Sequence, residues 1–271
     1  STVPVITLTG SSAITHEAAT AYSDAGAAWT DTLDGNGSVS ANGSVNASVP
    51  DAYTLTYDFN DTASNAATQV TRTVTVQDTT IPVITLAGSA SVTHEAATAY
   101  SDAGATWADT LDGNGSVSAN GSVNVSVPGV YTLTYSKSDA AGNAATQVTR
   151  TVTVQDTTVP VITLSGSSAV THEAATAYSD AGATWTDALD GNGFISANGS
   201  VNVSVPGVYT LTYFKSDTAG NAASQVTRTV TVQDTTVPVI TLTGSSAPKH
   251  EAATAYSDAG ATWTDTLDGN G

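Results

Sequence analysis

The amino-acid sequence repeats itself with a fixed period. The segment Pro-Val-Ile-Thr-Leu begins at positions that lie 78 residues apart, namely Pro4, Pro82, Pro160 and Pro238. The second and third copies of the repeating unit match at about six positions in seven. A chain of this kind folds as a series of equivalent modules. We therefore divide it into repeat 1 (1–78), repeat 2 (79–156), repeat 3 (157–234) and repeat 4 (235–271), which holds the first half of a unit.

Each repeat has the pattern of β-strands joined by tight turns. In repeat 2, Val148, Val152 and Val154 alternate with threonines, the period of a strand with one buried face. Asn-Gly and Pro-Gly pairs separate such runs, and no segment shows a helical period. The pattern predicts a small all-β Greek-key sandwich. We expect Trp107 and Tyr131 at its centre, with the Tyr131 hydroxyl tying the corner beside the Pro-Gly turn.

Two further segments of repeat 2 carry strand predictions. Residues 82–86 are a short apolar run opened by Pro, typical of an edge strand, and residues 91–95 are predicted to continue it. Residues 116–127 predict two short strands around an Asn-Gly turn.

The charge balance of the chain limits its partners. Asp and Glu number 24 against six Lys and Arg, which gives a formal net charge of −18. The basic residues stand singly along the sequence, whereas nucleic acids and anionic membranes are bound by clusters of them. We therefore expect no nucleic-acid binding and no membrane insertion in this segment, whereas its acidic surface attracts cations. Because there is no Cys, disulfides and thiol chemistry are unavailable.

The order of the motifs resembles a known family. The run DTTVPVITL, THEAATAYSDAGATW, LDGNG, GSVNVSVPGVYTLTY and SDAAGNAATQVTRTVTV is similar to the tandem bacterial immunoglobulin-like surface repeats of the pesticidal-crystal-protein and hyalin-like type. The resemblance covers three full repeats and the start of the fourth. It implies tandem immunoglobulin-like Greek-key β-sandwiches of about seven strands each, arranged as a linear rod, that serve as spacers without catalytic residues. The loop LDGNG departs from the family's more usual acidic turn.

No motif predicts catalysis. His94 and Glu95 recur as a pair in every repeat, but a zinc-protease helix needs a second His four positions on, where Thr98 stands. We expect the imidazole at a half-exposed strand edge near Glu95. Catalytic groups are usually placed once, whereas each polar group here recurs from repeat to repeat. The sequence therefore predicts that the chain is not an enzyme.

Calcium is the one cofactor for which the sequence makes a case. The ion takes about six to eight oxygen ligands, which flexible turns rich in Asp, Asn and Gly supply. In repeat 2 the turn Asp-Thr-Leu-Asp-Gly-Asn-Gly offers three such side chains, and the junctions between repeats offer further carboxylates. The candidate ligands are Asp31, Asp34, Asn36, Asp109, Asp112, Asn114, Asp187, Asp190 and Asn192 in the turns, and Asp78, Asp156, Asp234, Asp139 and Asp217 near the junctions.

Two interpretations of these side chains stay open. In the first, Asp112 and Asn114 only cap a hairpin turn through their own backbone. In the second, the turn or the junction binds calcium, and Asp156 meets Asp139 or Asn143. About four residues separate the last strand of one repeat from the first strand of the next, so the tether itself limits hinge motion.

Nearly identical repeats in series are more typical of a protein that spans a distance than of one that forms a single binding pocket. We expect a structural spacer or stalk of a bacterial extracellular adhesin or surface filament, at the cell surface. Its partners would be other copies of the chain or adjoining repeats, with a host or surface glycan at a tip elsewhere. The alternatives are a carbohydrate- or surface-binding module that uses threonine-rich strand faces, and accessory domains of a larger secreted enzyme. Because repeat 4 holds only the first strands, we expect the chain to continue past residue 271.

Overall fold

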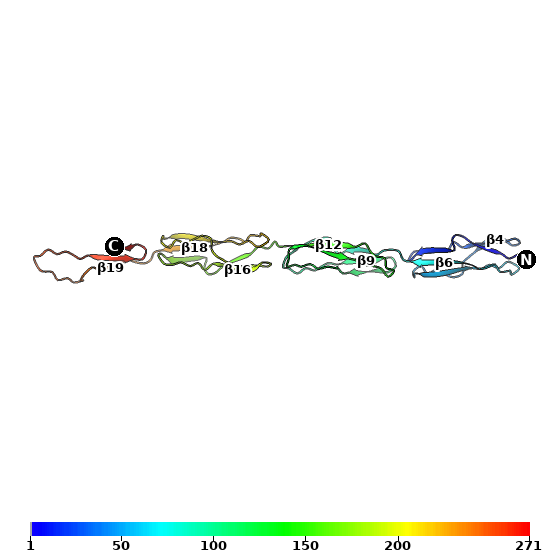
Figure 1. Ribbon diagram of the computed structural model, residues 1–271, viewed down its shortest axis with the longest axis horizontal. Coiled ribbons are helices and arrows are strands. Elements are labelled where there is room, and N and C mark those ends of the chain that lie inside the picture. Colours follow the sequence, from blue (N-terminus) through cyan, green and yellow to red (C-terminus); the bar gives the residue numbers. More distant parts are fainter. Residues whose placement is uncertain (1) are drawn as a thin grey trace. The chain divides into compact units, whose positions relative to one another are not determined.

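The computed structural model describes residues 2–271, which form strands, turns and loops (Figure 1). Repeat 1 contains β1 (Val5–Leu8), β2 (Ala13–Glu17), β3 (Ala27–Asp31), β4 (Gly35–Val39), β5 (Asp51–Tyr57) and β6 (Val70–Gln77). Repeat 2 contains β7 (Val83–Leu86), β8 (Ser91–Glu95), β9 (Ala105–Asp109), β10 (Gly113–Val117), β11 (Gly129–Tyr135) and β12 (Val148–Gln155). Repeat 3 contains β13 (Val161–Leu164), β14 (Ala169–Glu173), β15 (Ala183–Asp187), β16 (Gly191–Ile195), β17 (Gly207–Tyr213) and β18 (Val226–Gln233). Repeat 4 contains β19 (Val239–Leu242), β20 (Ala261–Asp265) and β21 (Gly269–Asn270).

Backbone contacts divide the chain into two compact units. The first comprises residues 2–94, 99–124 and 129–154, and the second comprises residues 95–98, 125–128 and 155–271. Repeat 1 lies within the first unit and repeat 3 within the second, so each of them shows a complete sandwich. A helix able to cross a membrane is absent from the described part of the chain.

Two three-stranded sheets make up each sandwich. In repeat 1, β3 lies between β1 and β4 in one sheet, and β6 lies between β2 and β5 in the other. Repeat 3 has the same order, with β15 and β18 in the middle positions. The pairs β2–β6 and β14–β18 are parallel, and the other pairs of these two repeats are antiparallel. The predicted all-β class is confirmed.

Two segments differ from their strand predictions. Residues 91–95 form a separate strand, and the equivalent β2 in repeat 1 joins the opposite sheet from β1, because the chain turns between them at Gly10 (φ 90°). The strand expected after the Asn-Gly turn is absent over 44–49 and 200–205, and the Asn of the turn itself makes a single bridge, Asn42 with Thr56 and Asn198 with Thr212. Among the described residues, each full sandwich thus has six strands and two isolated bridges, in place of the seven strands expected. In repeat 1, Gly43 (φ 101°) turns the backbone just after the bridge at Asn42.

The hydrophobic core lies between the two sheets. In repeat 1 the buried apolar side chains are Ile6, Ala18, Ala27, Leu55, Tyr57, Val74 and Val76. Alternation along β6 points Val74 and Val76 inward, as period 2 requires. The prediction that Trp107 and Tyr131 occupy the centre is wrong, because both are only half-buried. Tyr135, four residues after Tyr131, is the fully buried ring.

The corner expected of Tyr131 is present at its equivalents. The Tyr53 hydroxyl donates to the Val49 carbonyl at 3.0 Å, and the Tyr209 hydroxyl donates to the Val205 carbonyl at 2.8 Å. This side chain therefore fixes the entry to the long strand and leaves the centre of the core to other residues.

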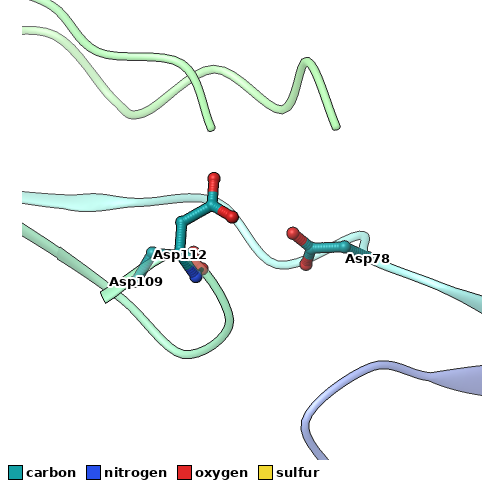
Figure 2. A group of neighbouring side chains, drawn as sticks. All are labelled: Asp78, Asp109 and Asp112. Atoms are coloured by element: carbon teal, nitrogen blue, oxygen red, sulfur yellow. Dashed lines mark hydrogen bonds between the residues drawn. The ribbon is translucent and has the colours of Figure 1, made fainter. Parts of the chain in front are cut away.

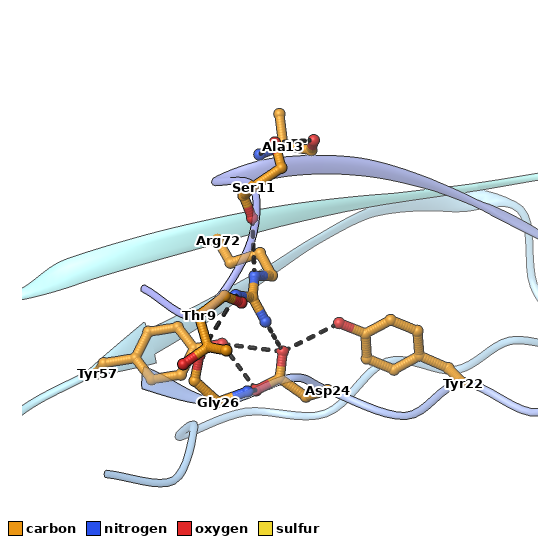
Figure 3. A network of polar contacts seen from close by, with 8 residues as sticks. All are labelled: Thr9, Ser11, Ala13, Tyr22, Asp24, Gly26, Tyr57 and Arg72. Atoms are coloured by element: carbon orange, nitrogen blue, oxygen red, sulfur yellow. Dashed lines mark hydrogen bonds and ion pairs between the residues drawn. The ribbon is translucent and has the colours of Figure 1, made fainter. Parts of the chain in front are cut away.

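An arginine lies at the centre of each core. Arg72 is 1% exposed, and it donates from Nε to the Ser11 carbonyl at 3.0 Å and from Nη2 to the Thr9 carbonyl at 2.6 Å. Its Nη1 pairs with Asp24, which also accepts from the Tyr57 hydroxyl at 2.8 Å (Figure 3). Arg150 and Arg228 make the same contacts in repeats 2 and 3. A buried guanidinium is tolerated only when its donors are satisfied, and this network satisfies them.

The network shifts the pKa values of Tyr57 and Asp24. Burial and the bond to Asp24 raise the pKa of Tyr57 to about 12. Burial opposes ionisation of Asp24, but the bonds from Tyr57, the Gly26 amide and Arg72 outweigh it and lower the pKa of Asp24. The stabilisation from Asp24 is therefore present above the unfolded-state pKa and is lost as pH falls through the lowered value.

Replacing the buried arginine is expected to unfold one repeat selectively. Arg72→Met leaves the Asp24 carboxylate without its cation, so we expect repeat 1 to lose about 3–5 kcal/mol of stability. Hydrogen exchange of the full chain measures this, because amides of β5 and β6 should lose protection while those of β17 and β18 keep theirs. Thr73→Ser on the exposed face of β6 is the control and should change stability by less than about 0.5 kcal/mol. Unchanged protection of β6 in Arg72→Met would contradict this role.

Candidate functional site at the ends of the repeats

In the three full repeats, the glutamate of the His-Glu pair binds the first residues that follow the repeat. Glu17 accepts from the Thr79 amide at 2.9 Å and from the Thr79 hydroxyl at 2.6 Å. It also accepts from the Thr80 amide at 3.2 Å and from the Thr80 hydroxyl at 2.8 Å. We call this set of bonds the glutamate clamp. Glu95 and Glu173 bind the equivalent threonines, Thr157 and Thr158 for the first and Thr235 and Thr236 for the second.

The parallel pairing of β2 and β6 explains the clamp. Glu17 ends β2 opposite Gln77, the last residue of β6, so its side chain reaches the residues that follow β6. Neighbouring side chains on a strand point to opposite faces, so His16 turns away from Glu17. The His16 Nε2 lies 3.1 Å from the Thr20 carbonyl oxygen, and its ring lies edge-on to Tyr22. The two side chains therefore bond different partners, and the half-exposed position expected for the imidazole is confirmed.

The clamp favours the ionised glutamate. Bonds from the Thr79 hydroxyl and amide, followed by those from Thr80, lower the pKa of Glu17 to about 2. Bonds from Thr157 and Thr235 likewise lower the pKa values of Glu95 and Glu173. Because the folded-state pKa is lowered, the contribution of the clamp is complete above about pH 4.5 and is lost as pH falls through about 2.

The turn between β9 and β10 is built by Asp109. Its Oδ1 accepts from the Leu111 amide at 2.8 Å and from the Asp112 amide at 3.0 Å. Asp112 instead reaches across to the next turn, where its Oδ2 accepts from the Ala140 amide at 2.5 Å. Asn114 lies on β10 opposite Ala108. Capping of the turn is thus confirmed in kind, but the capping residue is Asp109 and not Asp112 or Asn114.

The structure explains why glycine occupies positions 113 and 115. Gly113 has a φ of 86°, a conformation that side chains with a Cβ rarely adopt. Gly115 lies against Trp107, and a Cβ placed there would come within 2.9 Å of the indole Nε1.

The same turn recurs in the other full repeats. Asp31 caps Leu33 and Asp34, and Asp187 caps Leu189 and Asp190. Asp34 accepts from Thr62, and Asp190 accepts from the Thr218 amide. Asn36 and Asn192 lie on β4 and β16, paired with Thr30 and Thr186. The three predicted asparagines are therefore strand residues.

Four of the aspartates near the junctions bond an asparagine. Asp139 accepts from the Asn143 backbone and side-chain amides, both at 2.7 Å, and so caps its own turn. Asp217 and Asn221 do the same in repeat 3. The Asn143 side chain also donates to the Asp78 carbonyl at 3.0 Å, and the Asn221 side chain donates to the Asp156 carbonyl at 3.1 Å. Asp156 thus contacts Asn221 where the sequence predicted Asn143 or Asp139.

Three of the predicted aspartates come together at one point (Figure 2). Asp78, Asp109 and Asp112 each place one carboxylate oxygen within 4.8 Å of the others. Asp78 is 8% exposed, and burial together with the charges of Asp109 and Asp139 raises its pKa. We call these three side chains the acidic group.

A second acidic group forms at the start of repeat 4. It consists of Asp234, Asp265 and Asp268, which also place their oxygens within 4.8 Å of one another. Only Asp234 was expected as a ligand. The other two are the positions of Asp109 and Asp112 carried forward by two repeats, so the period of the sequence was the signal that would have found them.

Removing one hydroxyl from the clamp is expected to change the titration of the glutamate. Thr79→Val deletes the strongest bond to Glu17, so its pKa should rise from about 2 toward the ordinary value of 4.5. Carboxyl-carbon NMR of the full chain, labelled at glutamate, measures this shift. Glu173, held by Thr235, is the internal control and should titrate as in the unmodified chain. A Glu17 titration that is identical in both chains would contradict the clamp.

These features belong to a known class of domain. The chain is a member of the family described as "Bacterial surface protein, Ig-like domain", whose model matches residues 6–76, 84–154 and 162–232. The three full repeats are therefore tandem immunoglobulin-like β-sandwiches of this family.

The individual proteins to which the chain is similar share only part of its sequence. Hyalin of Strongylocentrotus purpuratus is 32% identical over 206 residues, which cover 69% of this chain and 17% of hyalin. Among solved structures, mouse cadherin-23 EC22-24 is 12% identical with a TM-score of 0.28, over 86% of this chain and 99% of that one. The M60 catalytic domain with two CBM51 domains from Clostridium perfringens ZmpB is 14% identical with a TM-score of 0.24, over 90% of this chain and 33% of that one. At these TM-scores, the two solved structures say nothing of how this chain works.

Proposed function

We infer that the chain is a spacer segment of the stalk of a bacterial extracellular adhesin or surface filament, in which the repeats supply reach and stiffness. The observation that carries this proposal is the glutamate clamp, which recurs at Glu17, Glu95 and Glu173. In each case a carboxylate at the end of a strand fixes the first two residues that follow the repeat. A tether held in this way has fewer accessible conformations than its short length alone imposes.

The independence of each core supports the same function. Repeats 1 and 3 each bury their own apolar side chains around their own arginine. Such modules can be added in series, with stability close to the sum of the repeats and their nearest-neighbour contacts. Length can then change by whole repeats without redesign of any core.

We assign no catalytic step to these repeats. The polar groups most able to do chemistry are the buried Arg72 and Tyr57 and the half-buried Asp24, and they bond one another and backbone carbonyls. The proposed partners are therefore structural ones: adjoining repeats of the same chain, or neighbouring chains of a filament. Any glycan would be recognised at a tip elsewhere.

Spin-label distances test whether the clamp stiffens the junction. The chain has no Cys, so Thr54→Cys and Thr132→Cys place two labels at equivalent exposed sites of repeats 1 and 2. We expect a narrow distance distribution in a full chain with Glu17 and a clearly broader one after Glu17→Ala, which removes every acceptor of the clamp. Glu251→Ala makes the same chemical change in repeat 4 and should leave the distribution narrow. A distribution already as broad with Glu17 in place as without it would contradict the stiffening function.

A further inference from the structure

The geometry points to a divalent-cation site of the Ca²⁺ class in the acidic group of Asp78, Asp109 and Asp112. This inference goes beyond the spacer function and does not depend on it. The three oxygens lie within 4.8 Å of one another. Calcium–oxygen distances are about 2.3–2.6 Å, so two ligands of one ion lie up to about 5 Å apart. Figure 2 shows the Asp78 carboxylate turned toward Asp112, with Asp109 beside it.

Unpartnered buried oxygens point to a ligand at this place. The Oδ1 atom of Asp78 accepts from the Thr80 amide at 3.1 Å, whereas its Oδ2 is buried and bonds no group of residues 2–271. Asp109 has the same asymmetry, because its Oδ1 caps the turn and its buried Oδ2 has no partner among those residues. A buried carboxylate oxygen without a partner is costly, and Asp78 is more than nine-tenths buried.

The equivalent pair of carboxylate oxygens also lacks a partner in the next repeat. Asp156 is 9% exposed, and its Oδ2 and that of Asp187 are likewise buried without a partner in the described chain. Repeat 1 offers the contrast: the Oδ2 of Asp31, the counterpart of Asp109, accepts from the Thr2 hydroxyl at 2.9 Å. The unpartnered oxygens thus recur at equivalent positions of two successive repeats. On this observation we extend the proposal to Asp156 and Asp187.

No cationic side chain neutralises the acidic group. The ion pairs formed within residues 2–271 join Arg72 to Asp24, Arg150 to Asp102 and Arg228 to Asp180. Carboxylates that face each other in a chain of net charge −18 attract small cations. Because water must complete the coordination of three carboxylates, the affinity expected is that of extracellular calcium modules, with a Kd of about 0.1–1 mM.

Equilibrium dialysis of the full chain against CaCl₂ tests the site. The chain is first freed of metal with a chelator, and bound calcium is then measured by atomic absorption. Asp78→Asn with Asp156→Asn replaces each unpartnered oxygen by an amide and keeps the acceptor that binds the following backbone. We expect this variant to bind two fewer ions per chain than the unmodified protein. Asp51→Asn with Asp58→Asn removes the same charge from exposed positions of repeat 1 and should leave the bound calcium unchanged.

A second variant distinguishes loss of the site from misfolding. Asp109→Asn keeps the turn cap through its oxygen, and its hydrogen-exchange pattern should match that of the unmodified chain while one ion is lost. Absence of calcium binding up to about 10 mM would overturn the site, as would equal binding by the junction variant and its control. The spacer function would survive either result, because the spin-label distances are measured in the presence of chelator.

Discussion

A buried guanidinium in each full repeat joins two sheets that otherwise meet through apolar side chains. Arg72 projects from β6 in one sheet and bonds the carbonyls of Thr9 and Ser11, which lie between β1 and β2, so it fixes where the chain changes sheets. A domain of this size and without disulfides has little core area, and its unfolding free energy is correspondingly small. A buried ion pair adds little net stability over a hydrophobic replacement, but its loss is expensive. The arginine thus ties β6 to the crossing that leads into β2, the strand that ends at Glu17.

The sequence was a good guide to the strands and a poor one to the polar side chains that link them. The period of 78 residues and the alternation of Val148, Val152 and Val154 predicted the repeats and the last strand because both are local patterns. The same alternation places Arg150 on the valine face, and this was the overlooked signal for a buried cation. Because charged side chains are mostly exposed in proteins, alternation alone does not predict that Arg150 is buried.

Local sequence patterns predict only part of the candidate site. Turn chemistry predicted that carboxylates cap the loop after β9, and a carboxylate does so, but which one depends on the backbone path. The approach of Asp78 to Asp109 and Asp112 joins residues from different repeats, and no spacing rule within one repeat encodes it. The pairing of Glu17 with Thr79 needed the parallel register of β2 and β6, which is visible only once the sheets are assembled.

The parallel pair β2–β6 sets how a repeat carries tension. The chain enters through β1 and β2 and leaves through β6, and β2 and β6 run in the same direction over Ala13–Glu17 and Thr73–Gln77. Pulling the two ends of the repeat apart slides these strands along each other, so every bond of the ladder is loaded at once. An antiparallel hairpin pulled from its open end would release its bonds one after another. The glutamate clamp closes the ladder at the exit of β6 and extends the region that shares the load beyond the last strand.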